Sequence, residues 1–279
     1  MPEGPEIRRM VDDIAGAIDD RDAQQVFFAF ERFKSYETAL AGRRITAVAA
    51  RGKAVLVFFA ARGDDGPWCV YSHNQLYGKW RITRASTTPN TRRQLRFAVF
   101  TNDKAARLYS ASDIRLVRPD ALNEIPYLAN LGPDPLNERV CADDLVERFS
   151  AARFAGRGLG GLLLEQGFIA GIGNYLRSEI LFEAGIAPKQ RPRDLDNQKR
   201  QELAEAVTRL IHRAYTTKGI TNPPERAERL KAEGLSFGRR RHMVFGRAGA
   251  GCYVCASAII KITVASRRLY YCPHCQAGA

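Results

Sequence analysis

The sequence predicts an α+β protein of several domains: a β-sandwich with a leading helix, a helical region, and a C-terminal β-hairpin with paired cysteines. Three observations predict this fold class. Short β-rich runs fill residues 26–118, helical apolar spacing follows beyond residue 138, and two Cys-x2-Cys pairs lie near the C-terminus. The 279 residues fit about two domains at ~150 residues each, enough for a core in each.

A helix is predicted over residues 5–20. Pro5 suits its first turn, because proline lacks the N–H that would have no partner there. The apolar residues that follow have the spacing of one helix face: Ile7, Met10, Val11, Ile14 and Ile18.

From about residue 26 to 118 the pattern changes to short β-rich runs. Turn sequences such as the one at 62–67 separate them. The predicted strands are 26–30, 54–60, 69–72, 80–83, 95–101 and 106–109. A helix followed by such a series indicates a β-sandwich domain, which we assign to residues 1–118.

Residues 119–137 contain four prolines and are predicted to be a linker. Helical spacing follows in 138–149, in two glycine-interrupted helices within 160–185, and in a helix that stops near Gly219. Residues 220–238 are charged and contain Pro223 and Pro224, so we expect a mobile connection. We assign 138–235 to a helical domain and 236–279 to a cysteine module.

The last four cysteines form two pairs, Cys252 with Cys255 and Cys272 with Cys275, separated by 16 residues. Two such pairs offer four thiolates to one tetrahedral Zn²⁺ ion. This zinc would be structural, because four protein ligands leave no place for water. We therefore expect one Zn²⁺ per chain, with two disulfides as the alternative.

The segment between the cysteine pairs predicts a β-hairpin rather than a helical finger. Residues 258–264 and 269–271 have strand character on either side of a turn at 265–268. Arg267 and Arg268 would lie at this turn, where a rigid scaffold can present them to a phosphate.

The chain is strongly basic, with 43 Lys and Arg residues against 30 Asp and Glu residues and a formal net charge of +13. Residues 236–279 carry +7 of this charge and no acidic residue. Their strand pattern indicates a folded basic module rather than a solvated tail. Such a charge favours nucleic acid as the partner, with an anionic membrane surface as the second choice.

No targeting segment or membrane span is expected. The opening MPEGPEIRRM lacks the apolar stretch of a signal peptide, and the one long weakly charged stretch, 158–176, contains six glycines. We expect a soluble, intracellular protein without a membrane partner. The single cysteines Cys69 and Cys141 are expected to be buried or half-buried thiols.

The sequence Gly171-Ile172-Gly173-Asn174 precedes a predicted helix. Glycines at such a place let backbone N–H groups approach an anion, and the helix dipole favours its charge. Asn174 could cap the helix or donate to a phosphate. The alternative is a tight turn without a ligand, closed by an asparagine N-cap.

Pro2 and Glu3 are candidates for covalent chemistry. If Met1 is removed, the chain begins with a secondary amine beside a carboxyl group. An α-amino group titrates at about 8, and a helix N-terminus lowers its pKa further because the dipole disfavours a cation. Such an amine attacking C1′ of a sugar gives an iminium, which acidifies C2′ and permits elimination of the 3′-phosphate. Many proteins begin in this way without such chemistry.

Several segments occur in the order of a known family: MPEGPEIRR at the start, RGKAVL at 51–56, SHNQLYGKWR at 72–81, YSASDI at 109–114, GPD at 132–134, FIAGIGNYLRSEILF at 168–182 and the cysteine hairpin. By these motifs the chain resembles the formamidopyrimidine-DNA glycosylase/endonuclease VIII family over nearly its whole length. The resemblance implies a β-sandwich domain, a helix–two-turn–helix domain and a zinc finger. It also implies a base-excision repair enzyme that is both a DNA glycosylase and an abasic-site lyase.

The resemblance implies roles for five residues at matching positions. Pro2 is the expected Schiff-base nucleophile, and Glu3 is the expected acid that assists sugar-ring opening and base loss. Lys53 is expected to bind phosphate and transfer a proton. Asn174 is the expected phosphate-binding residue of the helix–two-turn–helix, and Arg267 the zinc-finger arginine that grips phosphate and is assigned to δ-elimination.

Three further segments match or depart from the family. Gln75-Leu76-Tyr77 matches the trio that fills the gap left by an extruded nucleotide, because an apolar wedge beside a ring and an amide can replace stacking and pairing. Ordinary hairpin residues are the alternative. Asn130 stands where close relatives have a DNA-contacting arginine and is retained as a DNA-binding candidate. Residues 217–238 fit the family poorly and are longer than expected.

The Pro-Glu-Gly-Pro opening and the Gln-Leu-Tyr trio favour the endonuclease VIII branch, which removes oxidised pyrimidines and cleaves the strand by β,δ-elimination. The alternatives are an oxidised-purine (formamidopyrimidine or 8-oxoguanine) glycosylase of the same family and a non-catalytic zinc DNA-binding protein. The expected partner is double-stranded DNA with oxidised bases or abasic sites. We expect a monomer in the bacterial cytoplasm, associated with the nucleoid.

Overall fold

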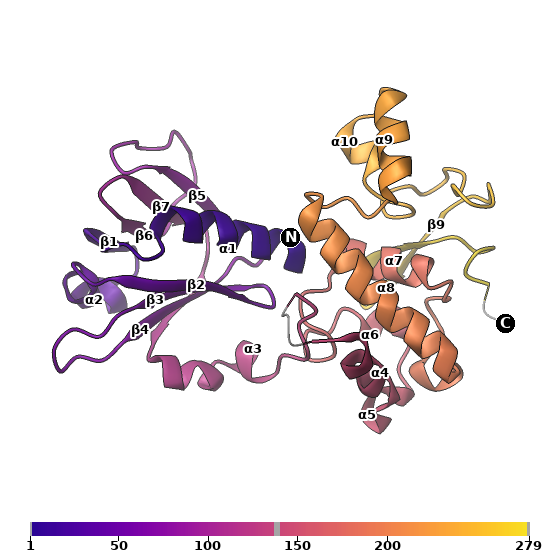
Figure 1. The fold of residues 1–279 in the computed structure, drawn as a ribbon, viewed down its shortest axis with the longest axis horizontal. Coiled ribbons are helices and arrows are strands. Elements are labelled where there is room, and N and C mark those ends of the chain that lie inside the picture. Colours follow the sequence, from indigo (N-terminus) through magenta and orange to yellow (C-terminus); the bar gives the residue numbers. More distant parts are fainter. Residues whose placement is uncertain (1, 137–139, 278–279) are drawn as a thin grey trace. The chain divides into compact units, whose positions relative to one another are not determined.

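The computed structural model describes residues 2–136 and 140–277, and this part of the chain forms two compact units (Figure 1). The first unit contains Pro2 and Ile7–Asn130, and the second contains Glu3–Glu6 and the chain from Leu131 onward. The predicted fold class is confirmed: a β-sandwich, a helical domain, and a β-hairpin with four clustered cysteines.

The first unit contains most of the leading helix, from Ile7 onward, followed by eight strands and several short helices. Its elements are α1 (Gly4–Ile18), β1 (Gln25–Phe28), η1 (Glu31–Phe33), α2 (Lys34–Leu40), β2 (Ile45–Arg51), β3 (Ala54–Phe59), β4 (Trp68–His73), β5 (Lys79–Arg84), β6 (Leu95–Phe100), β7 (Lys104–Tyr109), β8 (Asp113–Val117), η2 (Pro119–Glu124) and α3 (Pro126–Ala129).

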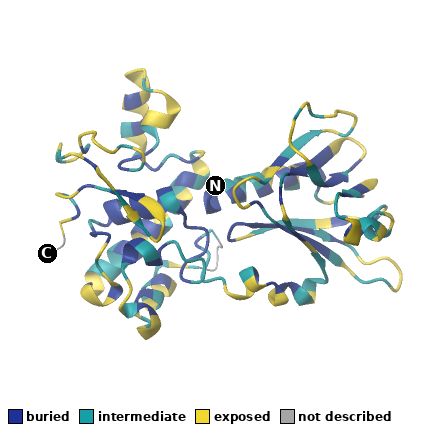
Figure 2. Ribbon diagram, turned by 180° about the vertical axis from the view of Figure 1, so that it is seen from behind, coloured by how far each residue is buried: buried dark blue, intermediate teal, exposed yellow. Residues whose placement is uncertain are grey.

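The strands form two four-stranded antiparallel sheets, in the orders β1-β6-β7-β5 and β2-β3-β4-β8. Alternate residues of β3, namely Val55, Val57 and Phe59, enter the shared core because side chains alternate along a strand. Ile7 and Ile14 of α1 enter the same core, as the predicted helix face requires. Strands are dark blue along much of their length in Figure 2, whereas the connections between them are largely yellow and exposed.

The strand register brings three connections to one end of the sandwich. Ala54 pairs with His73, and His73 pairs with Asp113 on β8. In the other sheet Lys79 pairs with Tyr109. The turn at 52–53 and the connections 74–78 and 110–112 therefore lie at the same end.

The sequence prediction misses two strands, β2 and β8, and one helix, α2. Three of the seven residues of β2 are alanines, which have low strand propensity and dilute the β pattern. β8 begins with an aspartate and contains an arginine, so its apolar run is short. α2 has only seven residues and continues from a 3-10 turn, which leaves too little sequence for a helical period.

The second unit is mainly helical and ends in a two-stranded hairpin. Its further elements are α4 (Ala142–Ser150), α5 (Ala152–Ala155), α6 (Leu159–Leu162), α7 (Asn174–Glu183), η3 (Pro192–Asp194), α8 (Asn197–Thr216), α9 (Pro224–Ala232), α10 (Phe237–Arg240), β9 (Ile260–Val264) and β10 (Arg267–Tyr271). Leu269 of β10 packs in the same core as α7 and α8, so the hairpin is part of this unit.

Two segments that the sequence predicts as irregular contain helical turns. In the proline-rich stretch, Pro119 begins η2 and Pro126 begins α3. Within 220–238, Pro224 begins α9, which contradicts the expected mobile connection. In each case the proline occupies the first turn, where its missing N–H costs no hydrogen bond.

The helices of the second unit also correct the expected bounds. The helix predicted at 138–149 is α4, which begins at Ala142, and residues 138 and 139 lie outside the described part. Of the two helices expected in 160–185, α6 has only four residues. Cys69 is buried as expected, but Cys141 is exposed, because it directly precedes α4 at the surface. None of the helices in the described part of the chain has the length and apolar character that a membrane span requires.

Candidate functional site

The Glu3 carboxylate lies at the N-terminus of α7. Its Oε1 accepts a hydrogen bond from the N–H of Tyr175 at 2.8 Å, and its Oε2 accepts from the N–H groups of Gly173 at 2.8 Å and Leu176 at 3.2 Å. The side chain is only 4% exposed. The first amides of a helix have no partner within it and attract negative charge. The helix therefore holds this carboxylate by three donors.

Two glycines of the turn before α7 make room for Glu3 and its neighbour. A Cβ atom on Gly173 would lie 2.6 Å from Oε1 of Glu3, closer than any side chain tolerates. Gly171 has a φ of +83°, and its carbonyl accepts from the N–H of Gly4 at 2.8 Å. A Cβ on Gly4 would in turn lie 3.0 Å from Cα of Gly171. The amides at the glycine turn thus bind the Glu3 carboxylate of the chain itself, and not the phosphate that the sequence predicts for them.

Asn174 does not cap α7, which corrects one of the two roles considered for it. Gly173 is the N-cap residue, and Asn174 is the first residue of the helix. Its Oδ1 accepts from Nη2 of Arg177 at 3.1 Å. No described residue accepts from its half-buried Nδ2 group, which leaves an oriented donor at the helix start.

Arg177 is fully buried and joins α7 to the hairpin. Its Nη1 donates to the carbonyls of Gly160 at 2.5 Å and Val264 at 3.2 Å, and its Nη2 donates to the carbonyls of Arg267 at 3.0 Å and Arg268 at 3.2 Å. Burial lowers the pKa of Arg177 to about 10, with Glu3 opposing the shift and Arg267 adding to it. The group remains protonated at neutral pH and supplies a fixed positive charge beneath the hairpin turn.

The hairpin turn consists of Ala265 and Ser266, whose φ values of +50° and +56° fit the tight two-residue turn that matches strand twist. Val264 pairs with Arg267, so β10 begins earlier than the sequence predicts. Arg267 and Arg268 are both exposed. The charge of Arg267 contributes to the lowered pKa of Arg177.

The four predicted zinc ligands come together. The Sγ atoms of Cys252, Cys255, Cys272 and Cys275 all lie within 4.8 Å of one another, and all four are free thiols, so the two-disulfide alternative is wrong. The closest pairs are 3.4 and 3.8 Å apart. Zn–S bonds of ~2.3 Å give a tetrahedron with edges of about 3.8 Å, so these cysteines fit a zinc ion.

The cysteine cluster is joined to the helices by Gln276. Its Oε1 accepts from the N–H of Cys272 at 2.8 Å, and its Nε2 donates to the carbonyl of Ile186 at 2.8 Å. This side chain is 1% exposed. The second cysteine pair is therefore fixed to the chain that follows α7.

A buried polar network on α7 was not predicted from the sequence. Glu179 accepts from the N–H groups of Met243, Val244 and Phe245 at 2.8 to 2.9 Å and from the hydroxyl of Thr221 at 2.6 Å. It thereby anchors the chain that leads into the cysteine hairpin. No local signal in the sequence distinguishes this buried acid from an exposed one, because Ser178 and Glu183 lie beside it on the helix.

Glu6 and Tyr175 connect this network to Glu3. The Tyr175 hydroxyl donates to Glu6, with its oxygen 3.0 Å from Oε1, and Glu6 Oε2 accepts from the N–H of Glu3 at 3.0 Å. Arg241 lies 3.7 Å from Glu6. Burial, followed by the charges of Glu6 and Glu3, raises the pKa of Tyr175 well above its ordinary value, so this phenol stays a donor.

In the first unit, Lys53 follows the positive-φ residue Gly52 in the turn between β2 and β3. Lys53 is 8% exposed, and its N–H donates to the Tyr127 hydroxyl at 2.7 Å. The Tyr127 ring packs edge-on against His73 at 4.8 Å between centroids. Burial lowers the pKa of His73, and the nearby Lys53 charge adds to this effect while Asp113 opposes it. The backbone of Lys53 is thus held at the end of the sandwich where the connections 74–78 and 110–112 also lie.

The predicted wedge is the connection between β4 and β5, which belong to different sheets. Leu76 and Tyr77 are 57% and 70% exposed, so neither is an ordinary core residue of a hairpin. Gln75 has a φ of +50°, and its Oε1 accepts from the Ser112 hydroxyl at 3.1 Å. Gly78 closes the turn, because a Cβ there would lie 2.6 Å from the carbonyl oxygen of Asn74.

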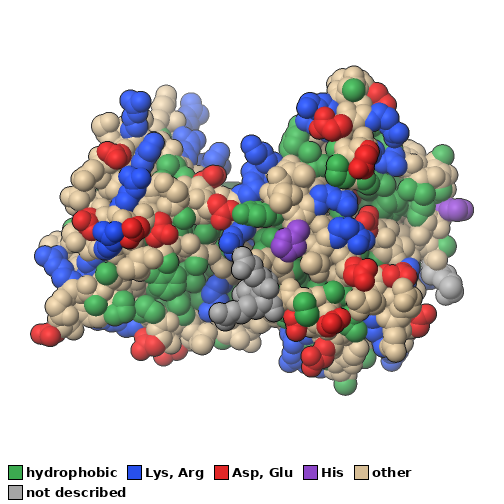
Figure 3. All heavy atoms as spheres, in the orientation of Figure 1, with side chains coloured by type: hydrophobic (Ala, Val, Ile, Leu, Met, Phe, Trp, Pro, Cys, Tyr) green, Lys and Arg blue, Asp and Glu red, His purple; other side chains and the backbone are tan. Residues whose placement is uncertain are grey.

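The remaining two predicted residues lie where the units begin and end. Pro2 is half-buried and directly precedes Glu3. Asn130 is exposed at the end of α3, and its Nδ2 donates to the carbonyl of Pro126 at 2.7 Å. Basic side chains occur on both units, so the positive charge is not confined to the hairpin (Figure 3).

Comparison with known proteins gives full-length matches. Residues 1–116 match the formamidopyrimidine-DNA glycosylase N-terminal domain, and residues 131–224 match the formamidopyrimidine-DNA glycosylase H2TH domain. Proteins named Endonuclease 8 from Salmonella schwarzengrund and Pectobacterium carotovorum are 41% and 40% identical over 276 residues, 99% of this chain and 100% of theirs.

A solved structure has the same fold. Lactococcus lactis Fpg (MutM), in a complex with DNA containing an oxidised pyrimidine, superimposes with a TM-score of 0.78. The match covers 99% of each chain at 22% sequence identity.

Acid stability of the second unit should depend on His242. Burial lowers its pKa from 6.5 to about 4, with Glu179 opposing the shift and Arg241 adding to it. Between these two values the unfolded chain binds a proton that the folded chain does not, so stability is retained above pH 6.5 and lost as the pH falls toward 4. The contribution is at most about 1.4 kcal/mol per pH unit.

His242→Gln keeps a side chain that can hydrogen-bond to Thr221 but cannot titrate. Urea unfolding at several pH values between 4 and 7 should show a smaller loss of stability in this variant than in the wild type. His212→Gln, on the exposed side of α8, is the matched control and should keep the wild-type pH dependence. An equal acid loss in His242→Gln and wild type would contradict the assignment.

Proposed function

The chain belongs to the formamidopyrimidine-DNA glycosylase/endonuclease VIII family, and we propose that it removes oxidised pyrimidines from duplex DNA and cuts the strand by β,δ-elimination. As a member of this family it is a bifunctional DNA glycosylase and abasic-site lyase. The observation that carries the proposal is the buried Glu3 carboxylate, fixed by three backbone N–H groups, directly beside Pro2 in the chain.

Pro2 is the proposed nucleophile. Once Met1 is removed, its secondary amine attacks C1′ of the damaged nucleotide, and the bond from C1′ to the base breaks. The base leaves as its anion and takes up a proton from solvent. The nitrogen loses its proton, and as the C1′–O4′ bond of the sugar ring breaks it forms an iminium with C1′. The iminium withdraws electrons, so a proton leaves C2′ and the 3′-phosphate is eliminated. A second elimination releases the 5′-phosphate.

Glu3 is the proposed proton carrier for the first steps. Its three N–H donors and the dipole of α7 stabilise a carboxylate, which can accept a proton from the attacking amine. It then delivers that proton to the sugar-ring oxygen as the ring opens. The tight packing around Gly173 keeps the carboxylate in one position through these steps.

Three side chains are proposed to bind DNA phosphates near the lesion. Asn174 offers its Nδ2 donor, oriented by the bond from Arg177 to its Oδ1. Arg267 is exposed at the hairpin turn, on a strand whose carbonyls Arg177 holds, and we assign it to the δ-elimination step. Lys53 supplies a further ammonium group and a proton-transfer role. Asn130 is a weaker contact, because its amide already donates to Pro126.

Gln75, Leu76 and Tyr77 are proposed to fill the space of the extruded nucleotide. Two exposed apolar side chains in a tight turn are costly in water and suit a wedge between base pairs. Extruding a nucleotide costs a few kcal/mol, and least at a damaged pair, so the wedge also contributes to selectivity.

The four clustered cysteines are proposed to hold one structural Zn²⁺ per chain. When bound, the ion supplies fixed geometry and no catalytic position, because four thiolates complete its shell. Its role is to hold the hairpin that presents Arg267.

Oxidised pyrimidines are proposed over oxidised purines because the Pro-Glu-Gly-Pro opening and the Gln-Leu-Tyr trio resemble the endonuclease VIII branch, and the relatives at 40 to 41% identity are named Endonuclease 8. We further propose that 1–118 is the catalytic domain, 119–137 a linker, 138–235 the helix–two-turn–helix DNA-binding domain and 236–279 the zinc finger, with residues 137–139 and 278–279 outside the described part. The proposed partner is double-stranded DNA with oxidised bases or abasic sites, bound by a monomer in the bacterial cytoplasm.

Borohydride trapping tests the Schiff base. Wild-type protein should form a covalent complex with duplex DNA containing an abasic site, and Pro2→Gly or retention of Met1 should abolish it. Glu3→Gln is the discriminating variant: it should still be trapped on abasic DNA, where the base is already gone, but not on DNA with an intact lesion. Absence of a trapped complex with wild type, despite salt-sensitive DNA binding, would favour the non-catalytic alternative.

A lesion panel tests the substrate class. Duplexes with thymine glycol, dihydrouracil or 8-oxoguanine should be compared under single-turnover conditions. We expect the two oxidised or reduced pyrimidines to be excised at least tenfold faster than 8-oxoguanine. The reverse order would assign the chain to oxidised purines.

Metal analysis tests the zinc site. Wild type should contain one zinc per chain, and Cys255→Ser should lose it together with DNA binding, because the hairpin then lacks its anchor. Cys141→Ser is the matched control, since this exposed cysteine lies outside the cluster, and it should retain one zinc. Full zinc content in Cys255→Ser would refute the site.

A further inference from the structure

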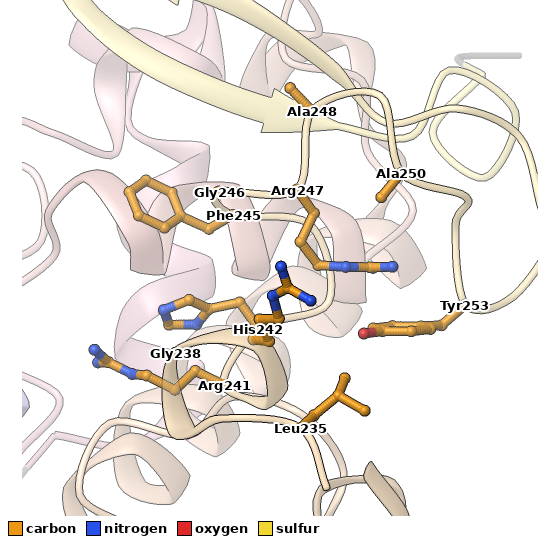
Figure 4. Close-up of a pocket in the computed structure, with 11 residues that line it drawn as sticks. Leu235, Gly238, Arg241, His242, Phe245, Gly246, Arg247, Ala248, Ala250 and Tyr253 are labelled. Carbon is orange, nitrogen blue, oxygen red and sulfur yellow. The ribbon is translucent and has the colours of Figure 1, made fainter. Parts of the chain in front are cut away.

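A pocket of about 570 Å³ lies between the α9–α10 segment and the loop that leads to the first cysteine pair (Figure 4). Leu235 and Arg239 line it from the side of α10, and Arg247 and Tyr253 line it from the loop. His242 forms part of the wall between them. Leu235 and Gly238 of this lining belong to residues 217–238, the part of the chain that fits the family poorly.

The pocket is lined by three arginines, Arg239, Arg241 and Arg247, and by no acidic residue. Glu6, outside the pocket, lies 3.7 Å from Arg241 and balances part of its charge. The Arg247 guanidinium lies 3.4 Å from the ring centroid of Tyr253 and donates to the carbonyl of Gly251 at 2.8 Å. Two of the three cations are therefore fixed in place before any ligand arrives.

Arg239 differs from the other two arginines. Its side chain is exposed, and no described residue forms a hydrogen bond or ion pair with its guanidinium. Arg226 of α9 adds a fourth cation, 5.1 Å from the Tyr253 ring centroid. Burial lowers the pKa of Arg247. Tyr253, Glu179 and Cys252 oppose this shift, and Arg226 adds to it.

We propose that this arginine pocket binds a phosphate group, either of the DNA backbone or of a free phosphate ester. Planar guanidinium groups bind phosphate oxygens in pairs, and several of them around one cavity select a compact anion of high charge. A stacked base is a poorer fit, because Arg247 covers the Tyr253 ring and His242 packs against Tyr175 at 5.0 Å between centroids. The DNA form of the proposal rests on the proposed function.

Arg239→Ala and Arg240→Ala form a matched pair for the test. Both remove one positive charge from α10, but only Arg239 lines the pocket, whereas Arg240 lies 5.6 Å from the Phe237 ring centroid. Binding to undamaged duplex DNA is measured between 50 and 200 mM salt. For Arg239→Ala we expect the slope of log affinity against log salt to shrink by about 0.9, the loss of one phosphate contact, and Arg240→Ala to keep the wild-type slope.

Inorganic phosphate distinguishes the two sources. If the salt slope is unchanged but phosphate raises the melting temperature of wild type and Arg240→Ala more than that of Arg239→Ala, the ligand is a free phosphate ester. Equal behaviour of both variants in both assays would overturn the proposal. Because this assay measures binding to undamaged DNA and requires no base excision, its result does not depend on whether the protein is a glycosylase.

Discussion

Helix α7 has almost no face in contact with water. Eight of its ten residues are buried, and among them are the arginine, the serine and one of the two glutamates of the helix. A buried charge or hydroxyl is tolerated only when the protein itself supplies its hydrogen-bond partners. Each polar group of α7 therefore fixes another part of the second unit, and the site is built from these attachments.

The attachments leave α7 in different directions. The helix N-terminus holds Glu3, Arg177 holds the carbonyls of the hairpin turn, and Glu179 holds the chain at 243–245. The Ser178 hydroxyl accepts from the N–H of Tyr270 at 3.2 Å and so fixes β10 directly. The residue beside the proposed nucleophile and the hairpin that carries Arg267 thus share one rigid support. Groups that act on the same nucleotide gain from such a support, because catalysis requires fixed positions.

A feature of the fold or of the site could be predicted only where the residues that determine it lie close together in the sequence. The cysteine pairs predict the hairpin correctly because metal-ligand geometry is encoded over a few residues. Arg177 and Glu179 could not be recognised as buried, since charged residues in a helix usually face water and nothing local marks the exception. The hydrogen-bond partners of Glu3 could not be predicted either, because they lie 170 or more residues away in the sequence. By contrast α9 was recognisable: Pro224 suits a first helical turn, and Ala227 and Leu230 have the spacing of a buried face.

The hydrogen bonds of Glu3 to the N-terminus of α7 also determine when, during translation, the start of the chain can reach its final position. The ribosome adds residues from the N-terminus, so Pro2 and Glu3 emerge long before the amides of residues 173–176 that Glu3 requires. Until then the start of α1 has no anchor, although the rest of that helix can already pack on the emerging sandwich. The proposed nucleophile can therefore reach its final position only after about two-thirds of the chain has been translated. The first residues of the chain are thus held by a helix from the middle of the polypeptide.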